Sequence, residues 1–227
     1  LRRCRRWVGA WAFHFAASAD PDDFARIHEA LSDNPNVTFA RKRIRCGWGE
    51  WSLVQATLQA LRAAVEDFPR ATHFYMLSGD CMAIKSAEYA HDFLDTHDQD
   101  FIESVDYFTS NWIKTGIQEE RLIYRHYFNE RTNKWLFYES VKWQRRLGLE
   151  RKIPEDLQIQ IGSQWWCLRR RTVEAVMDFI AKRKDVLRFF SSTWIPDETF
   201  FQTLVRHIVP GHKIEARPPP FLLFSDK

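Results

Sequence analysis

The chain has 227 residues, of which 45% are hydrophobic and 28% charged, and this composition is typical of a soluble globular domain. The formal net charge of +3 is small for a nucleic-acid-binding protein, and the four scattered cysteines lack zinc-binding spacing. No apolar run reaches the ~20 residues that span a bilayer. We therefore expect one cytoplasmic domain over residues 1–227, without metal, nucleic-acid partner or membrane span. A Golgi-lumenal or membrane-associated location is the alternative.

Both ends of the sequence lie in or near apolar stretches. An apolar run at 7–17 follows the basic start, and the chain stops at 227 just after another apolar run. The sequence also begins without an initiator methionine. These features predict that the chain is part of a longer protein and is truncated at both ends.

Predicted strands alternate with predicted helices along the chain. Apolar runs predict strands at 8–15, 37–40, 73–77, 101–105 and 159–168. Helical spacing of apolar residues predicts helices at 22–31, 52–68, 86–94, 135–147 and 171–181, and from 194 to about 208. This alternation predicts an α/β fold with a mostly parallel sheet and helices on both faces. The active site of such a fold lies at the carboxyl ends of the strands.

The segment 194–201 carries the strongest candidate for chemistry. Pro196 suits the first turn of a helix, which places Asp197 and Glu198 at the positive end of that helix. Acids in this position are also ordinary capping residues. A carboxylate fixed there beside aromatic side chains is equally suited to be a general base that takes a proton from an acceptor hydroxyl.

Two further segments have residues suited to ligand binding. The alternation of a strand puts Trp165 and Trp166 on opposite faces, so that one can be core while the other lines a cleft. Asp80 ends a strand as a single acid, whereas an Asp-x-Asp pair at this edge would be the expected ligand set for a divalent metal. A site without metal needs Lys or Arg to neutralise a leaving diphosphate.

Short motifs recur in a fixed order: RCGWG (45–49), SLV (52–54), YMLSGD (75–80), IKS (84–86), FIE (101–103), EER (119–121), GSQW (162–165) and PDE (196–198). Together they resemble the bacterial branch of the core-2/I-branching N-acetylglucosaminyltransferase family, which includes peptide O-xylosyltransferases. The resemblance implies a GT-A-like fold and an inverting, metal-independent enzyme. It implies transfer of a sugar, most simply N-acetylglucosamine, from a UDP-sugar to a glycan, polysaccharide or polypeptide acceptor, with no other cofactor.

The resemblance also implies roles for particular residues. Glu198 matches the catalytic base. The implied acceptor-binding residues are Glu103, Arg121 and Trp165, and the implied donor-binding residues are His14, Trp48, Ser78, Asp80 and Gln164. Gln118 stands where some members carry an acceptor-binding Lys, and Ala16-Ala17 stands where an Asp is usual.

The basic residues that hold the diphosphate in the family are expected beyond the last residue of the chain. Within it, Lys213, Arg217 and Lys227 are candidates by charge alone. Two other functions remain open: a UDP-xylose-dependent peptide O-xylosyltransferase, and a non-catalytic carbohydrate-binding or scaffold domain in which Trp rings stack on sugars.

Overall fold

The computed structural model describes residues 9–79, 81–217 and 222–224. Strand β1 (Trp11–Phe13) pairs in parallel with β2 (Val37–Phe39), and helix α1 (Pro21–Leu31) connects them. Asp20 starts α1 because its carboxylate accepts hydrogen bonds from the first free backbone N–H groups of the helix. Helix α2 (Trp51–Asp67) packs against both strands and buries one apolar side, which includes Val54, Leu58 and Leu61.

The central sheet has the order β3-β8-β5-β9 and is mixed. Its strands are β3 (His73–Tyr75), β8 (Trp166–Arg169), β5 (Asp100–Ile102) and β9 (Ile214–Glu215). Strand β8 is antiparallel to both neighbours, and β5 and β9 are parallel. The α/β class is confirmed, but the mostly parallel arrangement is wrong for this sheet. Alternation along the sequence does not reveal that β8, from far along the chain, separates β3 from β5.

Two small antiparallel pairs complete the described strands. Strand β6 (Val105–Asp106) pairs with β7 (Gln160–Ile161), and β4 (Cys81–Ala83) pairs with β10 (Leu222–Phe224). The run predicted as one strand at 159–168 is therefore two short strands, β7 and β8, in different sheets. The residues between them, 162–165, are free of sheet pairing and available for a site.

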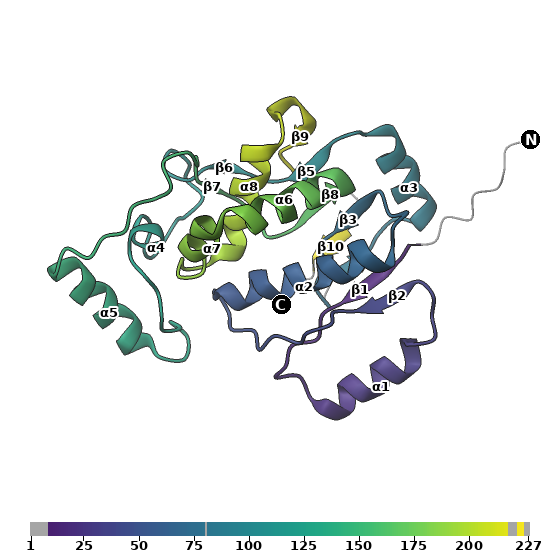
Figure 1. Ribbon diagram of the computed structural model, residues 1–227, viewed down its shortest axis with the longest axis horizontal. Coiled ribbons are helices and arrows are strands. Elements are labelled where there is room, and N and C mark those ends of the chain that lie inside the picture. The colour runs from purple at the N-terminus through teal and green to yellow at the C-terminus, as the bar shows by residue number, and fades with distance from the viewer. Residues whose placement is uncertain (1–8, 80, 218–221, 225–227) are drawn as a thin grey trace, which may run out of the picture.

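The helices follow the predicted pattern closely and are shown in Figure 1. They are α3 (Ala87–Thr96), α4 (Glu120–Ile123), α5 (Lys134–Arg146), α6 (Arg170–Lys182), α7 (Lys184–Phe190) and α8 (Phe200–Ile208), with 3₁₀ turns η1 (Pro196–Glu198) and η2 (Gly211–Lys213). The helix predicted from 194 is split into η1 and α8, and the short α4 and α7 were not predicted. Within the described residues, no helix combines the length and apolar character needed to cross a membrane.

The main core lies where α6 and α8 pack on each other and on the strands. Trp166 and Phe200 are almost completely buried in it, whereas Trp165 is only half-buried. Of the two neighbouring Trp residues, Trp166 is thus the core residue, and the placement of Trp165 in a cleft stays a prediction. A second, smaller cluster joins Phe137 of α5 to Trp194 and Ile195, and it attaches α5 to the segment that contains Glu198.

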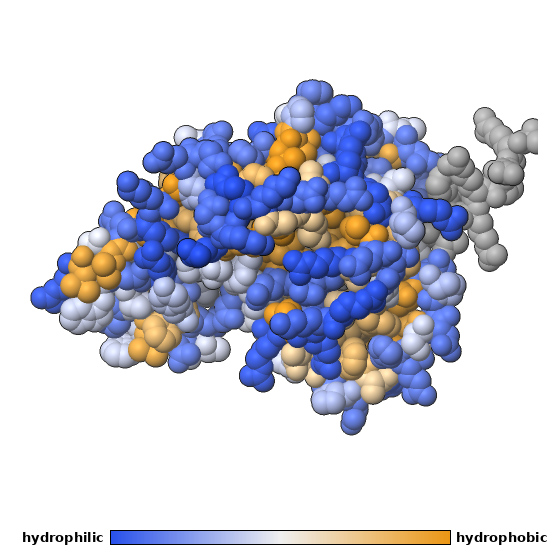
Figure 2. Space-filling view, viewed as in Figure 1, coloured by the Kyte–Doolittle hydropathy of each residue, from blue (hydrophilic) through white to orange (hydrophobic). Residues whose placement is uncertain are grey.

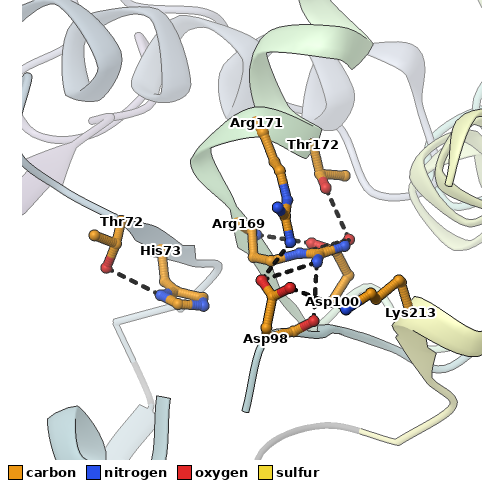
Figure 3. Close-up of polar contacts among 8 residues, drawn as sticks. All are labelled: Thr72, His73, Asp98, Asp100, Arg169, Arg171, Thr172 and Lys213. Carbon is orange, nitrogen blue, oxygen red and sulfur yellow. Dashed lines mark hydrogen bonds and ion pairs between the residues drawn. The ribbon is translucent and has the colours of Figure 1, made fainter. Parts of the chain in front are cut away.

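Asp100 is fully buried at the start of β5 and is held by four donors (Figure 3). It accepts hydrogen bonds from the backbone N–H of Arg169 at 2.8 Å, from Nη2 and Nε of Arg169 at 2.6 and 3.2 Å, and from the Thr172 hydroxyl at 2.7 Å. Arg169 also bonds Asp98, an exposed acid that Arg171 and Lys213 contact as well. A buried carboxylate needs such partners because its desolvation is otherwise uncompensated.

Replacing Arg169 by Ala should leave the Asp100 carboxylate buried without its charge partner. We expect the free energy of unfolding to fall by about 3–5 kcal/mol, measured by urea denaturation. The control is Arg171→Ala, which removes an exposed contact with Asp98 and should cost less than about 1 kcal/mol. Equal losses in the two variants would contradict the role of Arg169.

Candidate active site

Glu198 is the last residue of η1, and its position depends on an unusual backbone just before it. Ile195 adopts the left-handed conformation, with φ 51° and ψ 57°, which a β-branched residue rarely takes. Its N–H donates to the carbonyl of Gly49 at 2.9 Å, and the N–H of Trp194 donates to the carbonyl of Arg121 at 3.2 Å. These two bonds fix the turn that presents Glu198.

The Glu198 carboxylate faces a guanidinium. Arg121 of α4 places Nη1 3.4 Å from Oε2 of Glu198, and both side chains are largely buried. The Nε of Arg121 donates to the carbonyl of Ile117 at 3.0 Å, which orients the guanidinium. Burial raises the pKa of Glu198, while the charge of Arg121 and hydrogen bonds from Arg121 and Trp112 oppose that rise.

Gly162 joins three segments of the site through its backbone. Its N–H donates to the carbonyl of Glu198 at 2.9 Å. A Cβ atom at this position would lie 1.9 Å from the carbonyl oxygen of Glu103, so only glycine fits without movement of the backbone. The next residue, Ser163, accepts a hydrogen bond at 2.6 Å from the buried amide of Gln202 in α8. The predicted residues Glu103 and Glu198 are thus neighbours through the glycine between them.

An aromatic wall lies behind the Glu198 turn. The buried ring of Trp194 meets Trp48 edge-on, with 5.6 Å between ring centroids. Trp48 is 42% exposed, and the guanidinium of Arg131 lies 3.8 Å from its ring centroid. Asn129 holds this loop by donating to the Trp48 carbonyl at 3.0 Å and to Glu50 at 2.7 Å. The Trp48 indole is thus partly exposed, with the Arg131 guanidinium stacked on its ring.

A small cavity of about 160 Å³ lies beside Arg121. Its lining residues are Tyr107, Phe108, Ser110, Ile113, Gln118 and Glu119. The Tyr107 hydroxyl donates to the carbonyl of Gln118 at 2.7 Å, and the amide of Gln118 turns inward to donate to the carbonyl of Ile113 at 3.3 Å. A larger groove of about 840 Å³ lies elsewhere, between α2, α6 and α7.

Asp197, the residue before Glu198, has a largely buried carboxyl group. Its Oδ1 is buried and has no hydrogen-bond partner among the described residues. Burial is the main cause that raises the pKa of Asp197 to about 6, and the neighbouring charge of Glu198 adds to the rise. The two adjacent acids therefore both bind protons more tightly than an exposed carboxyl group does.

The other residues predicted to bind the donor are spread over several segments. Nε2 of His14 accepts a hydrogen bond from the N–H of Ile44 at 2.9 Å, and burial lowers the pKa of His14. Ser78 lies in an exposed turn, where its N–H lies 3.2 Å from Sγ of Cys81. Gln164 is half-buried in the connection between β7 and β8. Asp80 lies outside the described residues.

Two of the three basic candidates for the diphosphate form ion pairs in the structure. Lys213 lies 3.0 Å from Asp98, and Arg217 lies 3.0 Å from Glu215. Lys227 lies outside the described residues. The described part of the chain has no group of three or more His, Cys, Asp or Glu side chains placed to hold a metal ion.

Several residues of the site were not identified from the sequence. Trp112, which bonds Glu198, and Asn129, which fixes the Trp48 loop, lie between the predicted strand at 101–105 and the predicted helix at 135–147, where no element is predicted. A Trp or an Asn at these positions does not by itself indicate a site, because the sequence does not show which loops come together. The turn at Ile195 was not predicted either, because nothing in the sequence shows that this β-branched residue adopts the left-handed backbone conformation.

A comparison with protein families decides the class. A model of the Core-2/I-Branching enzyme family matches residues 7–216. The chain belongs to the Core-2/I-Branching enzyme family. This confirms the family predicted from the motifs, and with it a glycosyltransferase class, since the chain is also similar to xylosyltransferases.

The similar proteins are much longer than this member of the Core-2/I-Branching enzyme family. The chain is 29% identical over 216 residues to the "Xylosyltransferase" of Ciona intestinalis, covering 91% of the chain and 23% of that protein. It is 30% identical over 176 residues to "Xylosyltransferase 1" of Homo sapiens (76% and 17%) and 27% identical over 190 residues to "Xylosyltransferase oxt" of Drosophila melanogaster (81% and 20%). The chain thus spans about a fifth of the length of these relatives.

Gly162→Ala tests whether this Core-2/I-Branching domain depends on close backbone packing at its site. The added methyl group would overlap the carbonyl of Glu103, which cannot rotate away, so we expect unfolding to become easier by at least about 1–3 kcal/mol. Chemical denaturation gives this value. Gly211→Ala is the control because no atom lies within 4 Å of its added Cβ, and a similar loss there would contradict the packing argument.

Asp197→Asn should reveal the raised pKa as a change of stability with pH. Between the ordinary carboxyl pKa and about 6, the folded state binds the proton more tightly than the unfolded state, so wild-type stability from this group is lost as pH rises. The free energy of unfolding of Asp197→Asn, relative to that of the wild type, should therefore increase between pH 4 and pH 7.5, by on the order of 1–3 kcal/mol.

Urea denaturation at the two pH values measures that gain. The matched control is Asp33→Asn, at an exposed position, which should give the same difference from wild type at both pH values. A pH-independent difference for Asp197→Asn would show that Asp197 is ionised at little cost in the folded state.

Proposed function

We propose that the chain catalyses the inverting, metal-independent transfer of a sugar from a UDP-sugar to an acceptor hydroxyl on a GT-A-like fold, with Glu198 as the general base. The observation that carries the proposal is a largely buried carboxylate just before helix α8, paired with Arg121 in a segment that also contains Trp194. The proposal also rests on membership of the Core-2/I-Branching family.

The proposed step is a single displacement. The acceptor oxygen attacks the anomeric carbon as its proton passes to the Glu198 carboxylate. The bond from that carbon to the diphosphate breaks, and UDP leaves with the bonding electron pair. One base is enough for this reaction, whereas glycoside hydrolysis uses two carboxyl groups. Burial helps because a carboxylate with a raised pKa takes up a proton more readily near neutral pH.

Arg121 has a positioning role in this proposal. Its guanidinium holds the Glu198 carboxylate in one orientation and keeps it ionised before the reaction, against the effect of burial. Glu103, in the connection between β5 and β6, and Trp165, in the connection between β7 and β8, are proposed to contact the acceptor. Trp48, with an exposed ring, is proposed to lie on the donor side.

Xylose is the donor sugar that the comparisons favour, because the similar proteins named above are xylosyltransferases. N-Acetylglucosamine is the alternative that the motifs alone implied. UDP release from UDP-xylose and from UDP-N-acetylglucosamine, with EDTA present, tests the proposal and distinguishes the two donors. Sugar binding without UDP binding or release would favour a carbohydrate-binding module instead.

Glu198→Gln should retain the fold and UDP binding but lose sugar transfer by about 10²- to 10⁴-fold, because the amide cannot accept the proton. The measurement is the initial rate of UDP release, together with UDP affinity by calorimetry. The control is Glu155→Gln, at an exposed position, which should leave the rate unchanged. Near-normal turnover in Glu198→Gln would exclude Glu198 as the base.

A further inference from the structure

Helix α5 exposes an unusual amount of apolar surface. We call the side chains Trp135, Leu136, Trp143, Leu147 and Leu149 the α5 surface; each is between 37% and 73% exposed. Single exposed apolar residues are ordinary, but a contiguous group marks a surface that binds something. The helix lies at one end of the long axis of the molecule, where apolar side chains alternate with charged ones (Figures 1 and 2).

The helix carries two kinds of exposed stripe side by side. Leu136, Trp143 and Leu147 recur at the spacing i, i+7, i+11, so they lie along one side of the helix. The preceding positions, Trp135, Lys142 and Arg146, form an adjoining stripe, and the guanidinium of Arg146 lies 5.5 Å from the ring centroid of Trp143. Lys142 also lies 3.2 Å from the carboxylate of Glu139, so the apolar surface is bordered by two cationic side chains of which one is in an ion pair.

Positive charges outnumber negative ones around α5. Residues 125–152 contain eight Lys and Arg but three Glu, a formal excess of five positive charges. The whole chain has a formal charge of +3, so the remaining residues together have a formal charge of −2. A second copy docking through the same face would bring two cationic surfaces together, which is unfavourable. The charge favours an anionic partner.

The helix is firmly attached beside the candidate active site. Phe137 is fully buried and lies 4.8 Å from Trp194, measured between ring centroids. Gln144 both donates to the carbonyl of Arg125 and accepts from its N–H, each at 2.9 Å. A partner bound to the exposed side of α5 would therefore hold the Glu198 segment in a fixed orientation.

We propose that the α5 surface docks onto an anionic lipid bilayer, with the helix lying in the plane of the interface. Trp and Leu side chains then enter the boundary between headgroups and acyl chains, and Lys142 and Arg146 contact lipid phosphates. The exposed leucines favour lipid over an acidic polysaccharide, because a sugar stacks on flat aromatic rings rather than on branched aliphatic side chains. The proposal is independent of the sugar that the enzyme transfers.

Vesicle flotation with the complete 227-residue chain tests the proposal. Vesicles of phosphatidylcholine alone are compared with vesicles that contain phosphatidylglycerol, at low and high salt. We expect binding to the anionic vesicles only, weakened by salt. The pair Trp135→Ala and Trp143→Ala, and separately Lys142→Glu and Arg146→Glu, should each weaken binding by at least about 10-fold.

The control variants carry the same changes elsewhere on the surface: Trp11→Ala, and Lys182→Glu with Arg206→Glu. They should bind like the wild type. Lipids brominated in the acyl chains should quench wild-type Trp fluorescence more than that of the Trp135→Ala, Trp143→Ala variant, which reports insertion directly. UDP release with a soluble acceptor should be unchanged in all these variants, so the result is separate from the proposed transfer.

Four outcomes would overturn the proposal. These are no vesicle binding at low salt, equal binding to neutral and anionic vesicles, binding that survives both sets of α5 variants, and binding to a soluble acidic polysaccharide without binding to vesicles. Sedimentation of the wild type as a dimer that the two Trp substitutions abolish would assign the α5 surface to self-association instead.

Discussion

The candidate active site depends on the approach of two backbones at Gly162. The carbonyl of Glu103, at the end of β5, occupies the space where any other residue at 162 would have its Cβ atom. The N–H of Gly162 is at the same time bonded to the carbonyl of Glu198. One residue without a side chain thus sets the distance between a central strand, the break between β7 and β8, and the turn with the proposed base.

A second set of backbone bonds places the opposite side of the site. The turn at Ile195 is held by Gly49, and Trp194 is held by Arg121, so the loop before α2, helix α4 and η1 are bonded in series. Arg121 meets Glu198 because the backbone of its own segment is fixed to Trp194, two residues before Pro196. The carbonyl of Ile117 then orients the guanidinium, because it accepts a hydrogen bond from Nε of Arg121.

Much of the fold follows from sequence patterns of short range. The helix α2 is readable from its apolar spacing, α1 from the cap at Asp20, and α3 from the cap at Ser86, whose hydroxyl accepts from the N–H of Tyr89 at 3.2 Å. Strand direction and strand order do not follow from such short-range patterns. That β8 lies between β3 and β5 is decided by burial of Trp166 and by the pair of Asp100 with Arg169, which join distant segments.

The same division applies to the site. The PDE and EER motifs make Glu198 and Arg121 candidates, and their roles stay predictions. The pairing of these two residues, and the contribution of Trp112 and Asn129, depend on how loops meet and could not be read from local patterns. His14, which is predicted to bind the donor, accepts a hydrogen bond from the N–H of Ile44. This contact also joins separate segments and could not be read from a local pattern.

The bond from Ile195 to Gly49 has a consequence for the order in which the chain folds. It closes a loop that includes most of the polypeptide, and such closures are unfavourable until other contacts have brought the ends together. The helix α2 and the pairs of neighbouring segments can form early, whereas the turn at Glu198 is completed only after the strands have assembled. Helix α8, which follows this turn in the chain, supplies part of the main core, so the core and the candidate active site are completed together.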